Sequence, residues 1–91
     1  MKNYLYPAVV YPDRENRAFT ITIPDLNIVT EGETIEKAYL AIKEYVKNFL
    51  KVAIALNCVI SEPSSFVKLY KQNKGADVLI LLIDVDLDEA D

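Results

Sequence analysis

The sequence predicts an α+β fold in the element order β-β-β-α-α-β: a three-stranded antiparallel meander, a long helix, a short helix and a final strand. Three observations support this prediction. Apolar residues alternate between positions 17 and 24, they recur every three or four residues from 35 to 56, and they form an unbroken run at 78–83. Alternation is typical of a half-buried strand, and the longer period is typical of an amphipathic helix. With 91 residues, one core and a single domain over residues 1–91 are expected.

The meander is predicted from three short segments. Residues 5–11 are apolar on both faces, and residues 12–16 supply proline and aspartate for a turn. The second strand has an apolar face of Phe19, Ile21 and Ile23 and a polar face of Thr20 and Thr22. Pro24-Asp25 ends this strand, and residues 27–31 are long enough for a short third strand.

The long helix is predicted to begin after Thr34, whose hydroxyl suits an N-cap. Lys37 occupies the position where a capping box has Glu or Gln. One apolar stripe is expected to cover the sheet; it consists of Ile35, Ala38, Ile42, Tyr45, Val46, Phe49, Val52, Ala53 and Leu56. Asn57 is the expected end, since asparagine tolerates the left-handed conformation.

A short helix and a strand are expected after Asn57. The helix begins at Ser64 or Ser65, turns Phe66, Leu69 and Tyr70 inward and stops before Gly75. The strand, at residues 76–85, shows no alternation, which indicates burial on both faces and a place near the sheet centre. Because a helix precedes it, the strand is expected to run parallel to an earlier one.

Charge and composition exclude several functional classes. Five of the 14 acidic residues lie within the last eight positions, and the rest of the chain is near neutral, with 9 acidic and 10 basic residues. Without a dominant basic surface, direct binding to nucleic acid is not expected, and a basic protein partner suits the acidic end at 84–91 better. The single Cys58 cannot form an internal disulfide and is expected to pack in the interior. No charged-then-apolar signal segment opens the chain, so with a single cysteine the reducing cytoplasm is the expected location. No apolar run approaches the length of a membrane helix, so a soluble protein is expected.

Several segments in a fixed order carry a family resemblance. They are Tyr6-Pro7-Ala8, Tyr11-Pro12-Asp13, the run from Phe19 to Leu26 and the run from Thr30 to Ala38, with weaker matches at residues 60–64 and 78–87. In this order they resemble the HicB family of antitoxins. The chain departs from the family at Asn27-Ile28-Val29, where members commonly have a Pro-Gly-Cys-like turn.

The resemblance implies a partial ribonuclease H-like fold and a function. Such a protein neutralises a small basic ribonuclease toxin of the HicA type, which cuts messenger RNA, by occluding it. Many members also carry a C-terminal DNA-binding domain. This chain ends at Asp91, so a separate DNA-binding domain is not expected. A homodimer or higher homo-oligomer formed through sheet edges is expected.

The candidate partner-binding residues are acidic or lie on the polar strand face: Asp84, Asp86, Asp88, Glu89, Thr20 and Thr22. Carboxylates in this part of the chain can oppose the Lys and Arg side chains with which a toxin holds RNA. The plainer interpretation is a solvated tail that keeps the domain in solution. The tyrosines, among them Tyr11 and Tyr45, are further candidates for interface contacts.

Two alternative functions remain open. A ribonuclease H-like scaffold suggests a metal-dependent nuclease with carboxylates from Asp13, Asp25, Asp84 and Asp86. Asp13 and Asp25 stand beside proline in turns, however, and the chain has no histidine, so no catalytic, metal-binding or cofactor-binding residue is expected. The second alternative is a solitary scaffold domain without a toxin partner.

Overall fold

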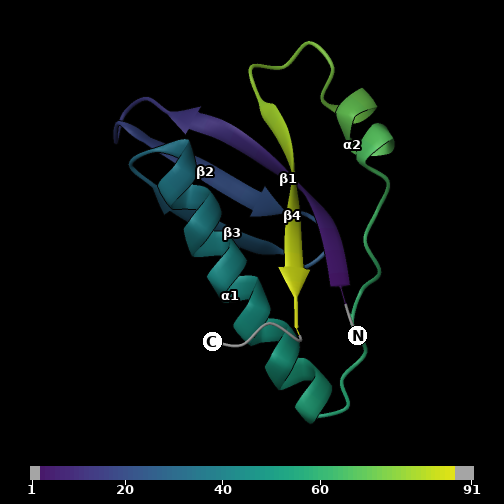
Figure 1. Ribbon diagram of the computed structural model, residues 1–91. Helices are drawn as coiled ribbons and strands as arrows, with labels where there is room; N and C mark the ends of the chain where they lie inside the picture. The colour runs from purple at the N-terminus through teal and green to yellow at the C-terminus, as the bar shows by residue number, and fades with distance from the viewer. Residues whose placement is uncertain (1–2, 88–91) are drawn as a thin grey trace.

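The computed structural model describes residues 3–87 and confirms the α+β fold and its element order. Its elements are β1 (Asn3–Asp13), β2 (Ala18–Ile23), β3 (Ile28–Gly32), α1 (Ile35–Ala55), α2 (Phe66–Gln72) and β4 (Leu79–Asp86). The strands form one antiparallel sheet in the order β3-β2-β1-β4. Figure 1 shows α1 lying across one face of this sheet and α2 standing beside the β1–β4 pair.

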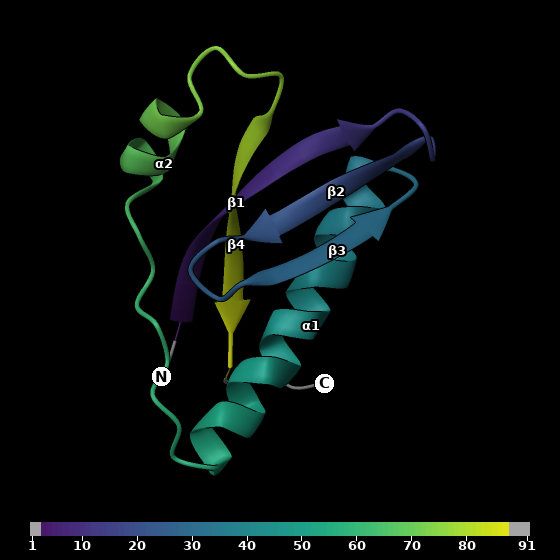
Figure 2. The same cartoon turned by 180° about the vertical axis from the view of Figure 1, so that it is seen from behind.

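The final strand corrects the sequence prediction in both direction and position. β4 lies at an edge of the sheet and runs antiparallel to β1, with Tyr6 opposite Ile83 and Val10 opposite Leu79. The physical reason is a return leg, the segment from residue 57 to residue 78. This leg runs back from the C-terminal end of α1 to the end of the sheet where α1 begins. β4 therefore starts at that end and runs antiparallel to β1 (Figures 1 and 2).

Polar contacts hold the return leg against the rest of the chain. A carboxylate oxygen of Asp25 in the β2–β3 turn accepts a hydrogen bond of 2.8 Å from the Ser64 amide, and the Ser64 hydroxyl donates to the other oxygen. At the opposite end, Arg14 pairs with Asp77 across 2.9 Å. Both partners of this ion pair are exposed, so it contributes little to stability.

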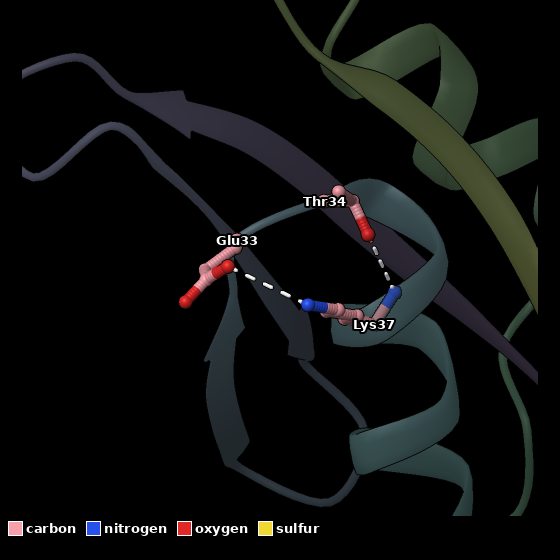
Figure 3. A network of polar contacts seen from close by, with 3 residues as sticks. All are labelled: Glu33, Thr34 and Lys37. Carbon is pink, nitrogen blue, oxygen red and sulfur yellow. Dashed lines mark hydrogen bonds and ion pairs between the residues drawn. The ribbon is translucent and has the colours of Figure 1, made fainter.

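Both ends of α1 have capping contacts that its sequence predicts. The Thr34 hydroxyl accepts a hydrogen bond of 3.0 Å from the Lys37 amide, and the Lys37 ammonium reaches back to Glu33 at 3.5 Å (Figure 3). At the other end Asn57 has φ +60°, its amide donates to Ile54 and the Cys58 amide donates to Ala53. This is a Schellman motif with asparagine in the left-handed position.

The core lies between α1 and one face of the sheet. The sheet contributes alternate residues of each strand, among them Tyr6, Val10, Ile21, Ile28 and Ile83, all buried. From the helix, the buried side chains are Ala38, Ile42, Val46, Leu50 and Ala53. The predicted stripe is therefore only partly correct. Its members Tyr45, Phe49, Val52 and Leu56 are exposed, because they lie to one side of the face that meets the sheet. Ile35, at the first position of the helix, is also exposed.

The short helix α2 begins after Ser65, as predicted, but it does not bury its aromatic residues. Phe66 and Tyr70 are exposed and stack on each other, with ring centroids 6.4 Å apart, and Leu69 is half-buried. A helix of seven residues at the sheet edge has too little sheet beneath it to cover three large side chains. The inward placement expected for Phe66 and Tyr70 is therefore wrong.

Gly32 permits the close approach between the end of β3 and the first turn of α1. A Cβ atom at this position would lie 2.8 Å from the Cα atom of Ala38 and 2.9 Å from the carbonyl carbon of Lys37. Real Cβ atoms do not approach backbone atoms this closely, so any other residue must push the helix away from the strand. The glycine thus sets how closely α1 packs at its start.

Gly32→Ala is expected to lower the free energy of unfolding by about 1–3 kcal/mol, because the added methyl group overpacks a backbone contact that cannot yield. Urea unfolding followed by circular dichroism measures the change. Glu31→Ala, at the exposed neighbouring position of β3, is the control and should stay within about 0.5 kcal/mol of the wild type. Equal stability of Gly32→Ala and Glu31→Ala would contradict this description of the contact.

Candidate functional site

The strongest candidate site is the open face, which we define as the sheet face turned away from α1. In antiparallel pairs, residues directly opposite each other point to the same side. Thr20 lies opposite Tyr11, Thr22 opposite Val9, and Asp84 opposite Leu5. Since positions 5, 9 and 11 of β1 alternate with positions 6, 8 and 10, whose side chains belong to the core cluster, all three partners point away from the core. The structure therefore brings Thr20, Thr22 and Asp84 onto one surface.

Asp86 lies on the same face, opposite Asn3, whereas Asp88 and Glu89 fall outside the described residues. Pairing also places further residues on this face, of which the sequence had marked only Tyr11 as an interface candidate and Asp13 as a nuclease candidate. In strand order they are Leu5, Pro7, Val9, Tyr11 and Asp13 from β1, Val29 and Glu31 from β3, and Ile80 and Leu82 from β4. Figure 2 shows the sheet from the side opposite to α1.

The open face carries negative charge. Four carboxylates lie on it, those of Asp13, Glu31, Asp84 and Asp86, while none of its strand positions between residues 3 and 87 holds Lys or Arg. Exposed apolar side chains lie between them, namely Leu5, Tyr11, Val29 and Leu82. Apolar contact area with charge of one sign around it is suited to binding a protein surface of opposite charge.

Part of this face is covered by the return leg. Pro7 is fully buried, and together with Pro24 and Asp25 it lines a small cavity of about 210 Å³ whose other wall is α2. The α2 residues of that wall are Lys68, Leu69 and Gln72. This cover leaves Asp84 exposed at one end of the face, whereas Thr20 at the other end is half-buried. Pro7, which lacks an amide donor, lies where β1 has β4 as its one neighbour, since pairing with β2 starts at Val9.

The four aspartates considered for nuclease chemistry do not converge. Asp13 accepts hydrogen bonds from the amide and the side chain of Asn16, which hold the pKa of the Asp13 carboxyl below its usual range. Asp25 binds Ser64, as described above. Asp84 of β4 lies opposite Leu5, which is eight residues from Asp13 along β1. At 3.3 Å per residue this places the two aspartates about 26 Å apart. Among residues 3–87, no three acidic, histidine or cysteine side chains come close enough to hold a metal ion.

A second exposed surface lies on α1 and was not predicted. Tyr45, Phe49, Val52 and Leu56 line a groove of about 550 Å³ together with Val59 and neighbouring residues. Cys58 also lines it and is exposed, so the expectation that this cysteine packs in the interior is wrong. The sequence did contain a signal for this surface. The apolar residues of α1 form two adjacent stripes, and one stripe is enough to cover the sheet. Neither described helix combines the length and the apolar character needed to cross a membrane.

A family model for the HicB-like antitoxin of bacterial toxin–antitoxin systems matches residues 6–91. The chain belongs to this family. The HicB-like resemblance of its short segments is thereby confirmed. A search of curated proteins gave no significant match.

Solved structures agree with this HicB-like assignment. The antitoxin HicB of Burkholderia pseudomallei superimposes with a TM-score of 0.80 at 26% identity, over 97% of this chain and 66% of that one. The crystallised N-terminal domain of that antitoxin gives 0.79 at 26% identity, over 91% of this chain and 99% of that one. A toxin–antitoxin complex from Streptococcus pneumoniae gives 0.78 at 20% identity, over 96% and 71%, a likeness of fold alone. The chain thus spans about two thirds of the full Burkholderia antitoxin.

Tyr6 of β1 points to the buried side of the sheet, opposite to the open face. The Tyr6 hydroxyl donates a hydrogen bond of 2.7 Å to the Ser61 carbonyl oxygen and so ties the return leg to β1. The Tyr6 ring stacks on Tyr4, with centroids 5.8 Å apart. Burial, with a smaller contribution from Tyr4, raises the pKa of Tyr6 to about 12.

Tyr6→Phe is expected to lower the free energy of unfolding at neutral pH by about 1–3 kcal/mol, because the Ser61 carbonyl loses its donor. The wild type should also lose stability between pH 10 and about pH 12, since the Tyr6 phenol ionises more readily in the unfolded chain than in the folded one. This part of the alkaline loss should be absent from Tyr6→Phe. Urea unfolding at several pH values measures both effects, with Tyr45→Phe as the exposed control. An alkaline loss of equal size in wild type and Tyr6→Phe would contradict the assignment.

Proposed function

We propose that this HicB-like chain is an antitoxin that neutralises a small basic, mRNA-cleaving toxin of the HicA type by occluding it. The observation that carries the proposal is the charge of the open face: four carboxylates and no strand Lys or Arg in the described part of the sheet. Family membership supplies the antitoxin role, and the surface supplies the kind of partner that fits.

The proposed mechanism is competition for the toxin's RNA-binding surface. A ribonuclease holds the RNA backbone with Lys and Arg side chains, which attract any surface of opposite charge. Carboxylates at Asp84 and Asp86 offer such charge, and Leu5 and Leu82 beside them offer apolar contact area. The carboxylates accelerate association with the toxin, and the apolar side chains stabilise the complex. The bound toxin then cannot bind RNA.

The chain itself performs no chemistry in this proposal. Asp13 and Asp25 have structural hydrogen-bond partners, and Asp84 lies far from Asp13 along β1. Inhibition by occlusion needs only a stable surface. The complex forms in the cytoplasm, where messenger RNA is cut.

Asp84→Lys is expected to weaken binding to the toxin about tenfold at low salt, mainly by slowing association, and the difference should shrink as salt screens the charges. The probe is the small basic protein encoded next to this chain, and surface plasmon resonance at several salt concentrations gives the rates. Glu44→Lys makes the same charge change on the exposed side of α1 and should leave the affinity unchanged.

Two further assays test the antitoxin role itself. Co-production of this chain should restore growth to bacteria that produce the neighbouring protein, and the purified chain should stop that protein from cutting RNA. Absence of any such neighbour, or failure to rescue growth, would support the solitary scaffold. Cleavage of RNA, DNA or a hybrid by the chain alone with Mg²⁺ or Mn²⁺, abolished by Asp84→Asn, would overturn the proposal in favour of a nuclease.

A further inference from the structure

The apolar strip on α1, which we define as Tyr45, Phe49, Val52 and Leu56, is a second surface that the toxin-binding proposal does not use. These side chains remain 58, 40, 58 and 69% exposed although each is apolar over most of its surface. Patches of this kind on a folded domain mark sites of interaction. The strip lies beside the buried face of α1, so it belongs to the same rigid helix that forms the core.

The spacing of the strip is that of a helix-packing surface. Its members follow at intervals of four, three and four residues, and alternation of this kind places side chains in a line along a helix so that they interlock with those of a second helix. At 1.5 Å per residue the strip is about 17 Å long, or three turns. The groove beside it, about 550 Å³ in volume, gives a facing helix a place to lie.

Charge distinguishes this strip from the open face. The positions that border it on the solvent side are Ala41, Asn48 and Ala55, none of them charged. The nearest charged side chains along that border, Glu44 and Lys51, have opposite signs. This surface therefore has no excess of carboxylates to attract a basic toxin. The same strip on a second copy of the chain would not be repelled by it.

We propose that the α1 strip binds a second copy of this chain, in a two-fold dimer whose α1 helices pack antiparallel. Two copies repel each other at their acidic open faces, so they associate through a surface without net charge. Five large side chains, Val59 included, are between 40 and 99% exposed. Together they offer roughly 500 Å² per copy, and the pair buries about 1,000 Å². This is near the lower limit for a specific interface, so the dimer forms in a concentration-dependent manner.

This proposed arrangement differs from the sheet-edge association expected from the sequence, and it leaves the toxin surface free in each copy. The helix α1, which carries the strip, lies on the opposite side of the sheet from the open face (Figures 1 and 2). One dimer can therefore hold two toxin molecules.

Val52→Glu is expected to abolish the dimer. Sedimentation velocity from about 1 to 200 μM should show the wild type passing from monomer to dimer, while Val52→Glu stays monomeric throughout. Leu40→Glu is the matched control, because Leu40 is 56% exposed on the same helix but away from the strip, and this variant should dimerise like the wild type. Circular dichroism verifies that both variants fold, and Tyr45→Ala, which adds no charge, should also weaken the dimer.

Three outcomes would overturn the inference. The first is a wild type that remains monomeric at every concentration. The second is a Val52→Glu variant that dimerises normally while Val29→Glu, on the open face, does not. The third is a loss of toxin binding in Val52→Glu, which would mean that the toxin binds the strip. The first two leave the antitoxin role intact, because growth rescue and the effect of Asp84→Lys are measured separately.

Discussion

One helix covers one face of a four-stranded sheet, and the surfaces of the molecule follow from this constraint. α1 approaches β3 so closely at Gly32 that a side chain has no room there, and from this point it crosses the sheet over Tyr6, Val10 and Ile83. Within residues 3–87, the opposite face is covered only by the return leg, which includes the seven-residue helix α2. A sheet of four strands with a single long helix must therefore leave backbone and side chains of one face exposed to solvent or to a partner.

The two exposed surfaces differ in their chemistry. The open face combines carboxylates with separate apolar side chains, which suits a basic partner and provides long-range attraction. The α1 strip is apolar and without net charge, so the hydrophobic effect can act there without electrostatic repulsion between copies. Because α1 carries both its buried stripe and the exposed strip, the proposed dimer requires no rearrangement of the core.

Local interactions made part of the structure predictable. Alternation in β2, the Thr34 cap and the left-handed Asn57 each depend on residues within a few positions, and all three are confirmed. The direction of β4 depends on how the return leg folds, and no local pattern encodes it. The same limit applies to α1, since periodicity marks Val52 and Val46 alike as apolar while sheet width decides which one is buried. Thr20, Thr22 and Asp84 were identified from charge and alternation, but their common face required the strand register.

The central claim is that the toxin binds the open face and a second copy binds the α1 strip. Methyl NMR of the labelled antitoxin tests it most directly, because Leu82 and Val29 report on the first surface, and Val52 and Leu56 on the second. Addition of toxin should shift the Leu82 and Val29 methyl signals and leave those of Val52 and Leu56 unchanged, and dilution of the antitoxin alone should do the reverse. Toxin-induced shifts confined to Val52 and Leu56 would contradict the account.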